Sequence, residues 1–357
     1  MNVTLFGYPK TGKTTLFNLI AGVHAAVRAY DDGKREPNVH AVPLPDLRLD
    51  RIAAAYPEKK RIAASMDLTD LVGISFGEVK TSLCLGHLRK ADGLVHIARA
   101  FAAEDLPHAR GRVDPVADVR SMEEELILAD LVLADARLER LEKDLKKMKD
   151  PEGEKERDLL ARLRPALESG CGLRGLPMTP AEEKLIRSFA FLSLKPLLHF
   201  INIDEKDLCS VRRPRTLFPA LGSERRVMAF CGRIEGDLAE LDAAERAAFM
   251  AEYGLAEMSG RLFAGEAAAF LDRISFFTVG KDEVRAWTVR KDASALEAAG
   301  AIHSDIAKGF VRAEVVPSDE LIRHGTLTQA KEAGAIRLEG KEYVVKDGDV
   351  IYFRFAP

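Results

Sequence analysis

The sequence predicts an α/β protein with a mainly parallel sheet, an inserted antiparallel helical hairpin and a C-terminal module rich in β-structure. Short apolar runs alternate with helical patterns in the first half, as a parallel sheet requires. A heptad repeat then separates two groups of these runs, and short β-type runs dominate the end of the chain. We expect one domain over 1–118 and 196–274, the insertion over 119–195, and the C-terminal module over 275–357.

The composition is that of a globular protein. Of the 357 residues, 47% are hydrophobic and 31% charged, and the formal net charge of −3 gives no general attraction to nucleic acid or acidic membranes. No apolar run reaches the roughly 18 residues of a membrane span, and no signal peptide precedes the first strand-like run. The four cysteines form no Cys-x-x-Cys pair. These features predict a cytoplasmic protein with no membrane association.

The sheet is predicted from short apolar runs. Val3–Phe6 is the first expected strand, and Lys13–Ala21 has the pattern of the helix that follows it. Further strands are expected at Arg61–Met66, Gly93–Ala98, Leu197–Ile203 and Arg226–Phe230. A long segment separates the second of these four runs from the third, so we expect an insertion there.

A heptad seam identifies this insertion as a coiled coil. Apolar residues alternate at spacings of four and three over three repeats, at Ile127, Leu131, Ala134, Leu138, Leu141, Leu145 and Met148. The segment Asp150–Gly153 is expected to break the helix, because proline and glycine both oppose its continuation. Leu160, Leu163 and Leu167 then face back in a second, antiparallel arm that contains Pro165. The seam is compatible with plain structural packing and with docking of a partner.

The C-terminal module is predicted from five β-type runs, at Phe276–Val279, Arg285–Val289, Val311–Val316, Tyr343–Val345 and Val350–Phe355. The segment Lys346–Asp349 has the composition of a hairpin turn between the last two runs. Trp287 belongs either to the core of this module or to a local basic face formed with neighbouring arginines.

The strongest functional signal is a phosphate-binding loop. Gly7–Thr14 fits G-x-x-x-x-G-K-[ST], with a strand before it and a helix after it. Glycines let several amides point at a phosphate, and the helix adds its positive end. We expect Lys13 to neutralise the β- and γ-phosphates and Thr14 to ligate Mg²⁺. The predicted nucleotide contacts here are Gly7, Pro9, Lys10, Thr11, Gly12, Lys13, Thr14 and Thr15.

Longer motifs connect this loop with the rest of the chain. They are Glu36-Pro37-Asn38, Val42–Asp46, Gly111–Pro115, Glu125–Leu131 and Asn202–Glu205, followed by Val284–Thr288, Gly309–Glu314 and Asp347–Phe355. With these motifs the whole chain resembles the YchF/Obg-like ATPase family of P-loop proteins. The resemblance implies a P-loop NTPase domain, a coiled-coil insertion, a C-terminal TGS domain of β-grasp-like fold, and association with the ribosome or its RNA. A monomer is expected.

The base-binding site is expected after the Leu197–Ile203 strand. Ras-like proteins read guanine with N-K-x-D, whereas this chain has Asn202, Ile203, Asp204 and Glu205. The lysine is absent and the acid is one methylene longer, so the pairing that selects guanine is displaced. We therefore expect ATP to be favoured, with GTP still accepted. Cys231 is expected to close over the base, and the alternative is that Asp204 and Glu205 form a solvated turn.

Two positions bear on hydrolysis. Lys34 stands where the family has a threonine that completes Mg²⁺ coordination. The segment Asp67–Asp70 is interpreted as the Asp-x-x-Gly element, with Asp67 holding Mg²⁺ and Asp70 in place of the glycine. A carboxylate beside the γ-phosphate would oppose triphosphate binding.

The resemblance also implies a catalytic histidine. Family members are thought to use a histidine in the loop before Gly-x-Val-Asp-Pro, and His108 matches that position. The alternative is an exposed loop histidine with no catalytic part. Two functions follow: a slow ATPase or GTPase that switches its hold on the ribosome, or a scaffold that binds a purine nucleotide with Mg²⁺ and hardly hydrolyses it.

Overall fold

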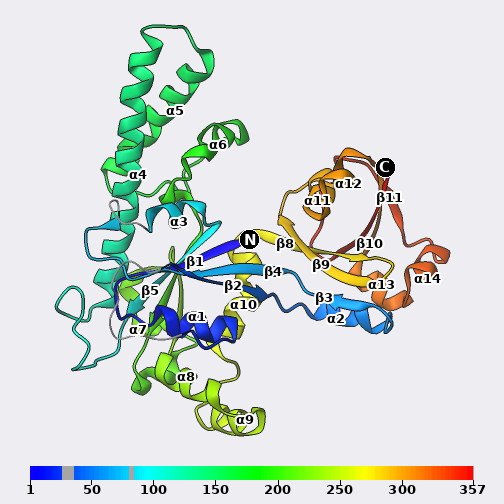
Figure 1. Cartoon of the computed structure of the whole chain (residues 1–357), viewed down its shortest axis with the longest axis horizontal. Coiled ribbons are helices and arrows are strands. Elements are labelled where there is room, and N and C mark those ends of the chain that lie inside the picture. Colours follow the sequence, from blue (N-terminus) through cyan, green and yellow to red (C-terminus); the bar gives the residue numbers. More distant parts are fainter. Residues whose placement is uncertain (26–35, 80–83, 357) are drawn as a thin grey trace. The chain divides into compact units, whose positions relative to one another are not determined.

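The computed structural model describes residues 1–25, 36–79 and 84–356, and the chain forms two compact units, each with its own sheet (Figure 1). The N-terminal unit comprises Met1–His40 and Asp67–Gly260. The C-terminal unit comprises Ala41–Met66 and Arg261–Pro357. A segment from the first part of the chain therefore belongs with the C-terminal module. The division expected from the sequence did not anticipate this grouping, and its domain boundaries stay a prediction.

The N-terminal unit is built on a parallel sheet, as the apolar runs predicted. Its neighbouring parallel strands are β4 (Ser65–Asp70), β1 (Asn2–Phe6), β5 (Gly93–Arg99), β6 (Leu197–Asn202) and β7 (Arg226–Phe230). β2 (Asn38–Pro43) lies beside β4. Every residue of β5 and β6 is buried, as expected for a parallel sheet covered on both faces. Figure 1 shows α3 and α4 on one face of this sheet and α1 and α8 on the other.

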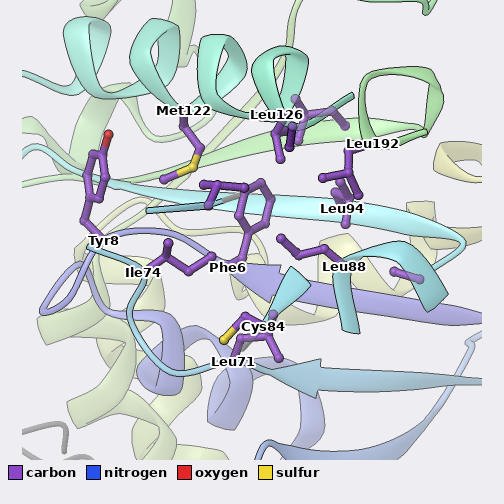
Figure 2. Packing of buried hydrophobic residues seen from close by; sticks show 14 residues of the cluster. Phe6, Tyr8, Leu71, Ile74, Cys84, Leu88, Leu94, Met122, Leu126 and Leu192 are labelled. Atoms are coloured by element: carbon purple, nitrogen blue, oxygen red, sulfur yellow. The ribbon is translucent and has the colours of Figure 1, made fainter. Parts of the chain in front are cut away.

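The helices of this unit include the one expected after the first strand, α1, with the predicted bounds. They are α1 (Lys13–Ala21), α3 (Leu85–Lys90), α4 (Pro115–Leu145), α5 (Pro151–Glu168), α6 (Pro180–Ile186), α7 (Pro214–Leu217), α8 (Gly232–Glu240) and α9 (Ala243–Glu252). A short 3₁₀ helix, Glu205–Ser210, follows β6. One core cluster packs α4 on the sheet: Met122 and Leu126 of α4 meet Phe6 and Leu94, with Tyr8 and Ile74 beside them (Figure 2).

The predicted strand Arg61–Met66 is wrong. The chain instead forms two strands, β3 (Lys60–Ile62) and β4, and β4 continues to Asp70. In β4, Met66 and Leu68 are buried while Asp67 is exposed. Asp67 and Asp70 interrupt the apolar run, so the sequence pattern does not reveal this half-buried strand and predicts a strand that ends too early. The displacement matters for the functional site.

The insertion is a helical hairpin. Along α4 the seam residues Ile127, Ala134 and Leu141 are buried, and they cluster with Leu160 and Leu163 of α5. Met148 lies beyond the end of α4 and is 72% exposed, so the seam stops before it. The break between the two helices lies earlier than the predicted Asp150–Gly153, because α4 ends at Leu145 and α5 begins at Pro151. Asp150 caps α5, its side chain accepting from the Glu152 amide, and Pro151 occupies the first turn, where proline is tolerated.

The C-terminal unit is a mixed sheet with strand order β11-β10-β12-β8-β9-β3. Its strands are β8 (Arg273–Val279), β9 (Glu283–Arg290), β10 (Phe310–Pro317), β11 (Arg337–Glu339) and β12 (Asp349–Phe355). Its helices are α2 (Leu47–Ala54), α10 (Ser259–Phe270), α11 (Ala295–Ile302), α12 (Ser304–Lys308), α13 (Ser318–His324) and α14 (Leu327–Glu332). β3 extends this sheet by pairing parallel with β9. The TGS assignment stays a prediction.

Two details of this unit differ from the sequence-based expectations. Tyr343–Val345 is no strand, because only Val344 forms a single bridge, with Ser294. Lys346–Asp349 is therefore no hairpin turn; the Asp349 carboxylate accepts from the Lys346 amide at 2.9 Å and from the Tyr343 hydroxyl at 2.8 Å. Trp287 is half-buried. Its indole N–H donates to the Thr278 hydroxyl at 3.0 Å, and its ring centre lies 4.2 Å from the Arg285 guanidinium carbon. Trp287 therefore packs partly in the core and partly against a basic side chain.

Candidate functional site

The phosphate-binding loop connects β1 to α1 at the carboxyl edge of the sheet. Gly7, Lys10 and Gly12 have positive φ angles of 144°, 62° and 97°. Gly12 is also held tightly, because a β-carbon there would lie 2.3 Å from Nδ2 of Asn202. The loop thus needs glycine at this position for both conformation and space. It ends at the N-terminus of α1, whose positive end favours an anion.

Lys13, the lysine of the phosphate-binding loop, lies against the loop backbone. Lys13 is 7% exposed, and its ammonium donates to the Tyr8 carbonyl at 2.8 Å. The Thr11 hydroxyl donates to the same carbonyl at 3.1 Å. Because an ammonium carries three donors, Lys13 can keep this contact and still reach a phosphate. The arrangement fixes the cation at the loop rather than leaving it in solvent.

A pocket of about 570 Å³ joins the loop to the strands that follow it. It is lined by Lys10, Gly12, Thr15, Phe101, Ala102, Ala103, Leu106, Asn202, Ile203, Asp204, Glu205, Cys231, Gly232 and Arg233. Asn202 ties its walls together: its amide donates to the Thr11 carbonyl at 3.1 Å and its oxygen accepts from the Gly232 amide at 2.9 Å. Seven of the predicted nucleotide-contacting residues therefore share one cavity, while Gly7, Pro9, Thr11, Lys13 and Thr14 lie along the loop.

The predicted metal ligand Asp67 is wrong. In the parallel pairing of β4 with β1, Asp67 lies opposite Asn2, at the amino end of the sheet, and is exposed. Asp70 lies opposite Leu5, next to the phosphate-binding loop. At about 3.3 Å per strand residue, the two carboxylates are separated by about 10 Å along the strand. Asp67 therefore faces away from the loop that it was expected to serve.

Asp70 takes the place given to Asp67. It is 4% exposed, and its Oδ2 accepts from the Thr14 hydroxyl at 2.8 Å and from the Asn38 amide at 3.2 Å. Three residues later, Gly73 lies against Pro9, where a β-carbon would be 2.7 Å from Pro9 Cα. The Asp-x-x-Gly element is therefore Asp70–Gly73. Asp70 does not replace that glycine, so the expected repulsion of a triphosphate from the glycine position does not arise.

Thr14 and Asp70 suit Mg²⁺. A hydroxyl and a carboxylate are hard oxygen donors, and octahedral bonds of about 2.1 Å place neighbouring ligands about 3 Å apart. The observed 2.8 Å between Thr14 Oγ1 and Asp70 Oδ2 fits that spacing. Among residues 1–25, 36–79 and 84–356, no three His, Cys, Asp or Glu side chains gather as a closed metal cage. Mg²⁺ bound with a nucleotide needs no such cage, because phosphates and water supply the other ligands. Lys34 lies outside the described residues.

His108 is buried, not exposed on a loop. Its side chain is 3% exposed, with Nε2 2.9 Å from Asp118 Oδ2 and its ring in edge contact with the Tyr8 ring at 6.5 Å. The Arg110 amide donates to His108 Nδ1 at 3.2 Å. Burial raises the pKa of Asp118, while His108 and Arg110 oppose that rise. The alternative of an exposed loop histidine is therefore wrong, and the His108 side chain lies beside Tyr8 of the phosphate-binding loop.

The acid at the base-binding position has a cationic partner. Glu205 Oε1 lies 2.9 Å from the Arg233 guanidinium, with side chains that are 44% and 80% exposed. Both residues line the 570 Å³ pocket, as does Cys231, whose thiol pKa is raised by burial. Glu205 therefore has a cation beside it at the edge of the pocket.

The sequence did not reveal three features of this site. Asp70 was expected at the glycine position and Gly73 had no expected role, because the strand was expected at Arg61–Met66 instead of Ser65–Asp70. The wall formed by Phe101, Ala102, Ala103 and Leu106 was missed although it follows a buried strand, and ligands in parallel sheets bind at the carboxyl ends of strands. The contact of Arg233 in α8 with Glu205, at the start of the 3₁₀ helix after β6, has no signal in the sequence.

A pair of buried histidines lies within the sheet below the loop. His96 of β5 and His199 of β6 are 0% and 1% exposed, and their Nδ1 atoms are 3.1 Å apart. His199 Nε2 lies 3.2 Å from Glu123, which also binds Arg225 at 2.7 Å. Burial, then the charges of His199 and Lys13, hold the pKa of His96 well below its usual value. Burial also lowers the pKa of His199, although Glu123 opposes this shift.

We expect stability to fall when the pH is lowered from about 6.5, the ordinary histidine pKa. Above that pH the two histidines are neutral in both the folded and the unfolded chain. Below it the unfolded chain binds protons at these histidines, whereas the folded chain does not. The free energy of unfolding therefore falls by up to about 1.4 kcal/mol per pH unit per histidine. Denaturant unfolding between pH 7.5 and 5.5 measures this. His96→Asn, whose amide replaces Nδ1, should flatten the decline. The exposed control His87→Asn should not, and equal slopes in all three proteins would contradict the assignment.

Two protein-family models match this chain. Residues 2–151 match a family model described as a 50S ribosome-binding GTPase, and residues 273–356 match the YchF-GTPase_C family, described as a protein of unknown function. None of the helices in the described part of the chain is long and apolar enough to cross a membrane.

Similarity extends over the whole chain. The Bacillus subtilis (strain 168) protein named Ribosome-binding ATPase YchF is 38% identical over 361 residues, 98% of each chain. The Haemophilus influenzae protein of the same name is 36% identical over 360 residues, again 98% of each. The structure of the Schizosaccharomyces pombe YchF GTPase superposes with a TM-score of 0.81 at 25% identity, covering 99% of this chain and 97% of that one. With a P-loop domain, a matching C-terminal region and full-length relatives at this identity, the chain belongs to the YchF family.

Proposed function

We propose that this protein binds a purine nucleoside triphosphate with Mg²⁺ at the Gly7–Thr14 loop, hydrolyses it slowly, and acts in association with the ribosome. The observation that carries the proposal is the 2.8 Å contact of Thr14 with Asp70 at the end of the phosphate-binding loop. The contact supports a shared role for this hydroxyl and carboxylate beside the loop that carries Lys13. The names of the relatives, ribosome-binding ATPase and GTPase, support the nucleotide and the partner.

The roles of the residues follow from this geometry. Loop amides and the N-terminus of α1 bind the phosphates, and Lys13 neutralises their charge. Thr14 and Asp70 hold Mg²⁺, which supplies charge neutralisation and orients the phosphate oxygens. Asn202 keeps the loop and the base-binding segment in register through Thr11 and Gly232. The apolar wall at Phe101 and Leu106 excludes water from one side of the pocket.

We propose ATP as the favoured nucleotide, with GTP also accepted. Reading of guanine requires a carboxylate aimed at its N1 and N2 hydrogens, whereas Glu205 is longer than the usual aspartate and faces Arg233 at 2.9 Å. Adenine needs no such acid. The absence of a lysine at Ile203 removes the aliphatic stem that covers guanine in N-K-x-D proteins.

The second candidate is a nucleotide-binding scaffold with little or no hydrolysis. One observation favours it: His108 Nε2 is engaged by the buried Asp118, so the ring must leave this partner before it can orient a water at the γ-phosphate. Asp70 does not favour the scaffold, since its carboxylate lies at the Thr14 hydroxyl and Gly73 follows three residues later against Pro9. We therefore place the slow hydrolase first.

Single-turnover hydrolysis with protein in excess separates the two candidates. We expect product from Mg–ATP, formed no more slowly than from Mg–GTP, at a rate that falls about a hundredfold in His108→Ala, because a positioned general base contributes that much. The exposed control His303→Ala should behave as the wild type. Binding without any product in the wild-type protein would favour the scaffold, and a clear preference for GTP would contradict the base assignment.

The cellular setting is proposed on the same grounds. The resemblance and the names of the relatives support ribosomal RNA or protein as the partner and the cytoplasm as the location. A monomer stays a prediction.

A further inference from the structure

We propose that Glu125 of α4 is a positioning residue that holds the loop after β4 and the Tyr8 ring in place, and thereby sets the γ-phosphate side of the site. This inference rests on the proposed function, because it assigns Glu125 a part in triphosphate binding. Glu125 is not among the residues that line the nucleotide pocket, and it would act through the loop Leu71–Val79. The hairpin helix and the nucleotide site are then mechanically connected.

The contacts of Glu125 are directed at the site. Glu125 is 9% exposed, and its Oε1 accepts from the Gly77 amide at 2.9 Å while Oε2 accepts from the Val79 amide at 3.1 Å. The Tyr8 hydroxyl donates to Oε1 over a longer 3.4 Å. A buried carboxylate must be compensated, and charge-assisted bonds to backbone amides are strong. One side chain of α4 thus fixes two points of this loop and one of the phosphate-binding loop.

Apolar packing reinforces these polar contacts. Ile74 and Val79 of the loop lie in one core cluster with Met122 and Leu126, the residues that flank Glu125 on α4. Figure 2 shows the Tyr8 ring beside Met122 with its hydroxyl directed toward α4. Burial raises the pKa of Tyr8 to about 12, so the hydroxyl stays a donor at physiological pH. The loop therefore follows the inner face of α4.

The same loop meets the phosphate-binding loop at its other end. The Ile74 amide donates to the Gly7 carbonyl at 3.1 Å, and Gly73 lies against Pro9. Asp70, the proposed metal ligand, begins this segment. In switch-type NTPases the segment after this aspartate is ordered by the γ-phosphate and Mg²⁺. A diphosphate does not reach it, so a change at Glu125 should affect triphosphate binding selectively.

The helix that carries Glu125 continues into the hairpin. α4 has 31 residues, about 45 Å at 1.5 Å per residue, and Glu125 lies in the part that packs on the sheet. Leu141, further along α4, packs on α5 in the hairpin cluster. A displacement of α4 at the hairpin would therefore move the carboxylate that holds Gly77 and Val79.

Titration of the full chain with two probes tests the proposal: Mg²⁺ with the non-hydrolysable β,γ-imido analogue of ATP, and Mg–ADP. Glu125→Gln should weaken the analogue about tenfold, the loss expected for one charge-assisted bond, and change ADP affinity less than twofold. The matched control Glu124→Gln makes the same charge change on an exposed neighbour and should alter neither affinity. Equal weakening of both nucleotides, an unchanged Glu125→Gln, or the same effect in Glu124→Gln would overturn the inference.

Hydrogen exchange of the wild-type protein provides a measurement that does not depend on a variant folding. Without nucleotide, the Gly77 and Val79 amides should exchange at least tenfold more slowly than those of the exposed Glu104 and Asp105, and Glu125→Gln should remove this protection. Fast exchange at Gly77 and Val79 would overturn the inference alone. If the wild-type protein binds neither nucleotide, the proposed function falls and the inference falls with it.

Discussion

Lys13→Ala is expected to weaken Mg–ATP binding several hundredfold, which is about 3–4 kcal/mol. Lys13 is 7% exposed and held on the loop by the Tyr8 carbonyl, so its ammonium would meet the phosphates with little solvent between them. Truncating one partner of a buried charge pair typically costs about 2–5 kcal/mol, because the other charge is left uncompensated. Isothermal titration calorimetry measures the effect directly.

The control for this variant is Lys143→Ala, which removes the same charge from an exposed position on α4. Its affinity should match that of the wild type. The thermal stability of nucleotide-free Lys13→Ala should be close to that of the wild type. The variant loses the hydrogen bond to the Tyr8 carbonyl, but it also loses the cost of burying a cation. Unchanged ATP affinity in Lys13→Ala would refute the assignment of the phosphate-binding loop.

Asp70→Asn is expected to reduce the Mg²⁺-dependent part of ATP affinity about 10- to 100-fold, the loss typical of disturbing a metal's protein ligands. Asparagine keeps the size of the side chain but removes the charge that Thr14 Oγ1 contacts at 2.8 Å. The measurement is a pair of ATP titrations, one with Mg²⁺ and one with a chelator. Without Mg²⁺ the variant should bind as well as or better than the wild type, because a carboxylate near the phosphates has gone.

Asp67→Asn is the matched control, since it makes the same change three residues earlier in the same strand. Asp67 is exposed at the amino end of β4, so its titrations should equal those of the wild type. If Asp67→Asn lost Mg²⁺ dependence and Asp70→Asn kept it, the register derived for Asp70–Gly73 would be wrong.

The parts of the site that could be predicted from the sequence are local. The phosphate-binding loop is one contiguous strand–loop–helix segment, and its glycines, lysine and threonine have roles that follow from their spacing alone. The helix Lys13–Ala21 and the strands β1, β5, β6 and β7 also follow from continuous apolar patterns. Asn202 and Glu205 were predicted as base-binding residues because Asn202–Glu205 stands where Ras-like proteins have N-K-x-D, and both line the pocket.

The parts that could not be predicted depend on pairing between distant segments. The register of β4 against β1 decides whether Asp67 or Asp70 lies next to the phosphate-binding loop. That register is set only when the two strands pair, so it cannot be found from either segment alone. The sequence left open whether the His108 side chain is exposed, and packing beside Asp118 of α4 buries it. Glu125 belongs to the motif Glu125–Leu131, but the sequence does not show that its carboxylate accepts from the Gly77 and Val79 amides.

The sequence by itself determined the P-loop, the parallel sheet, the helical hairpin and the family, since each is written in contiguous motifs and periodic patterns. Only the tertiary structure decided that β3 joins the C-terminal sheet beside β9, that Arg48 binds Asp347 at 2.7 Å within that unit, and that Asp70 meets Thr14. These contacts join residues far apart in the chain, and their geometry comes from strand pairing and core packing, which no local pattern encodes.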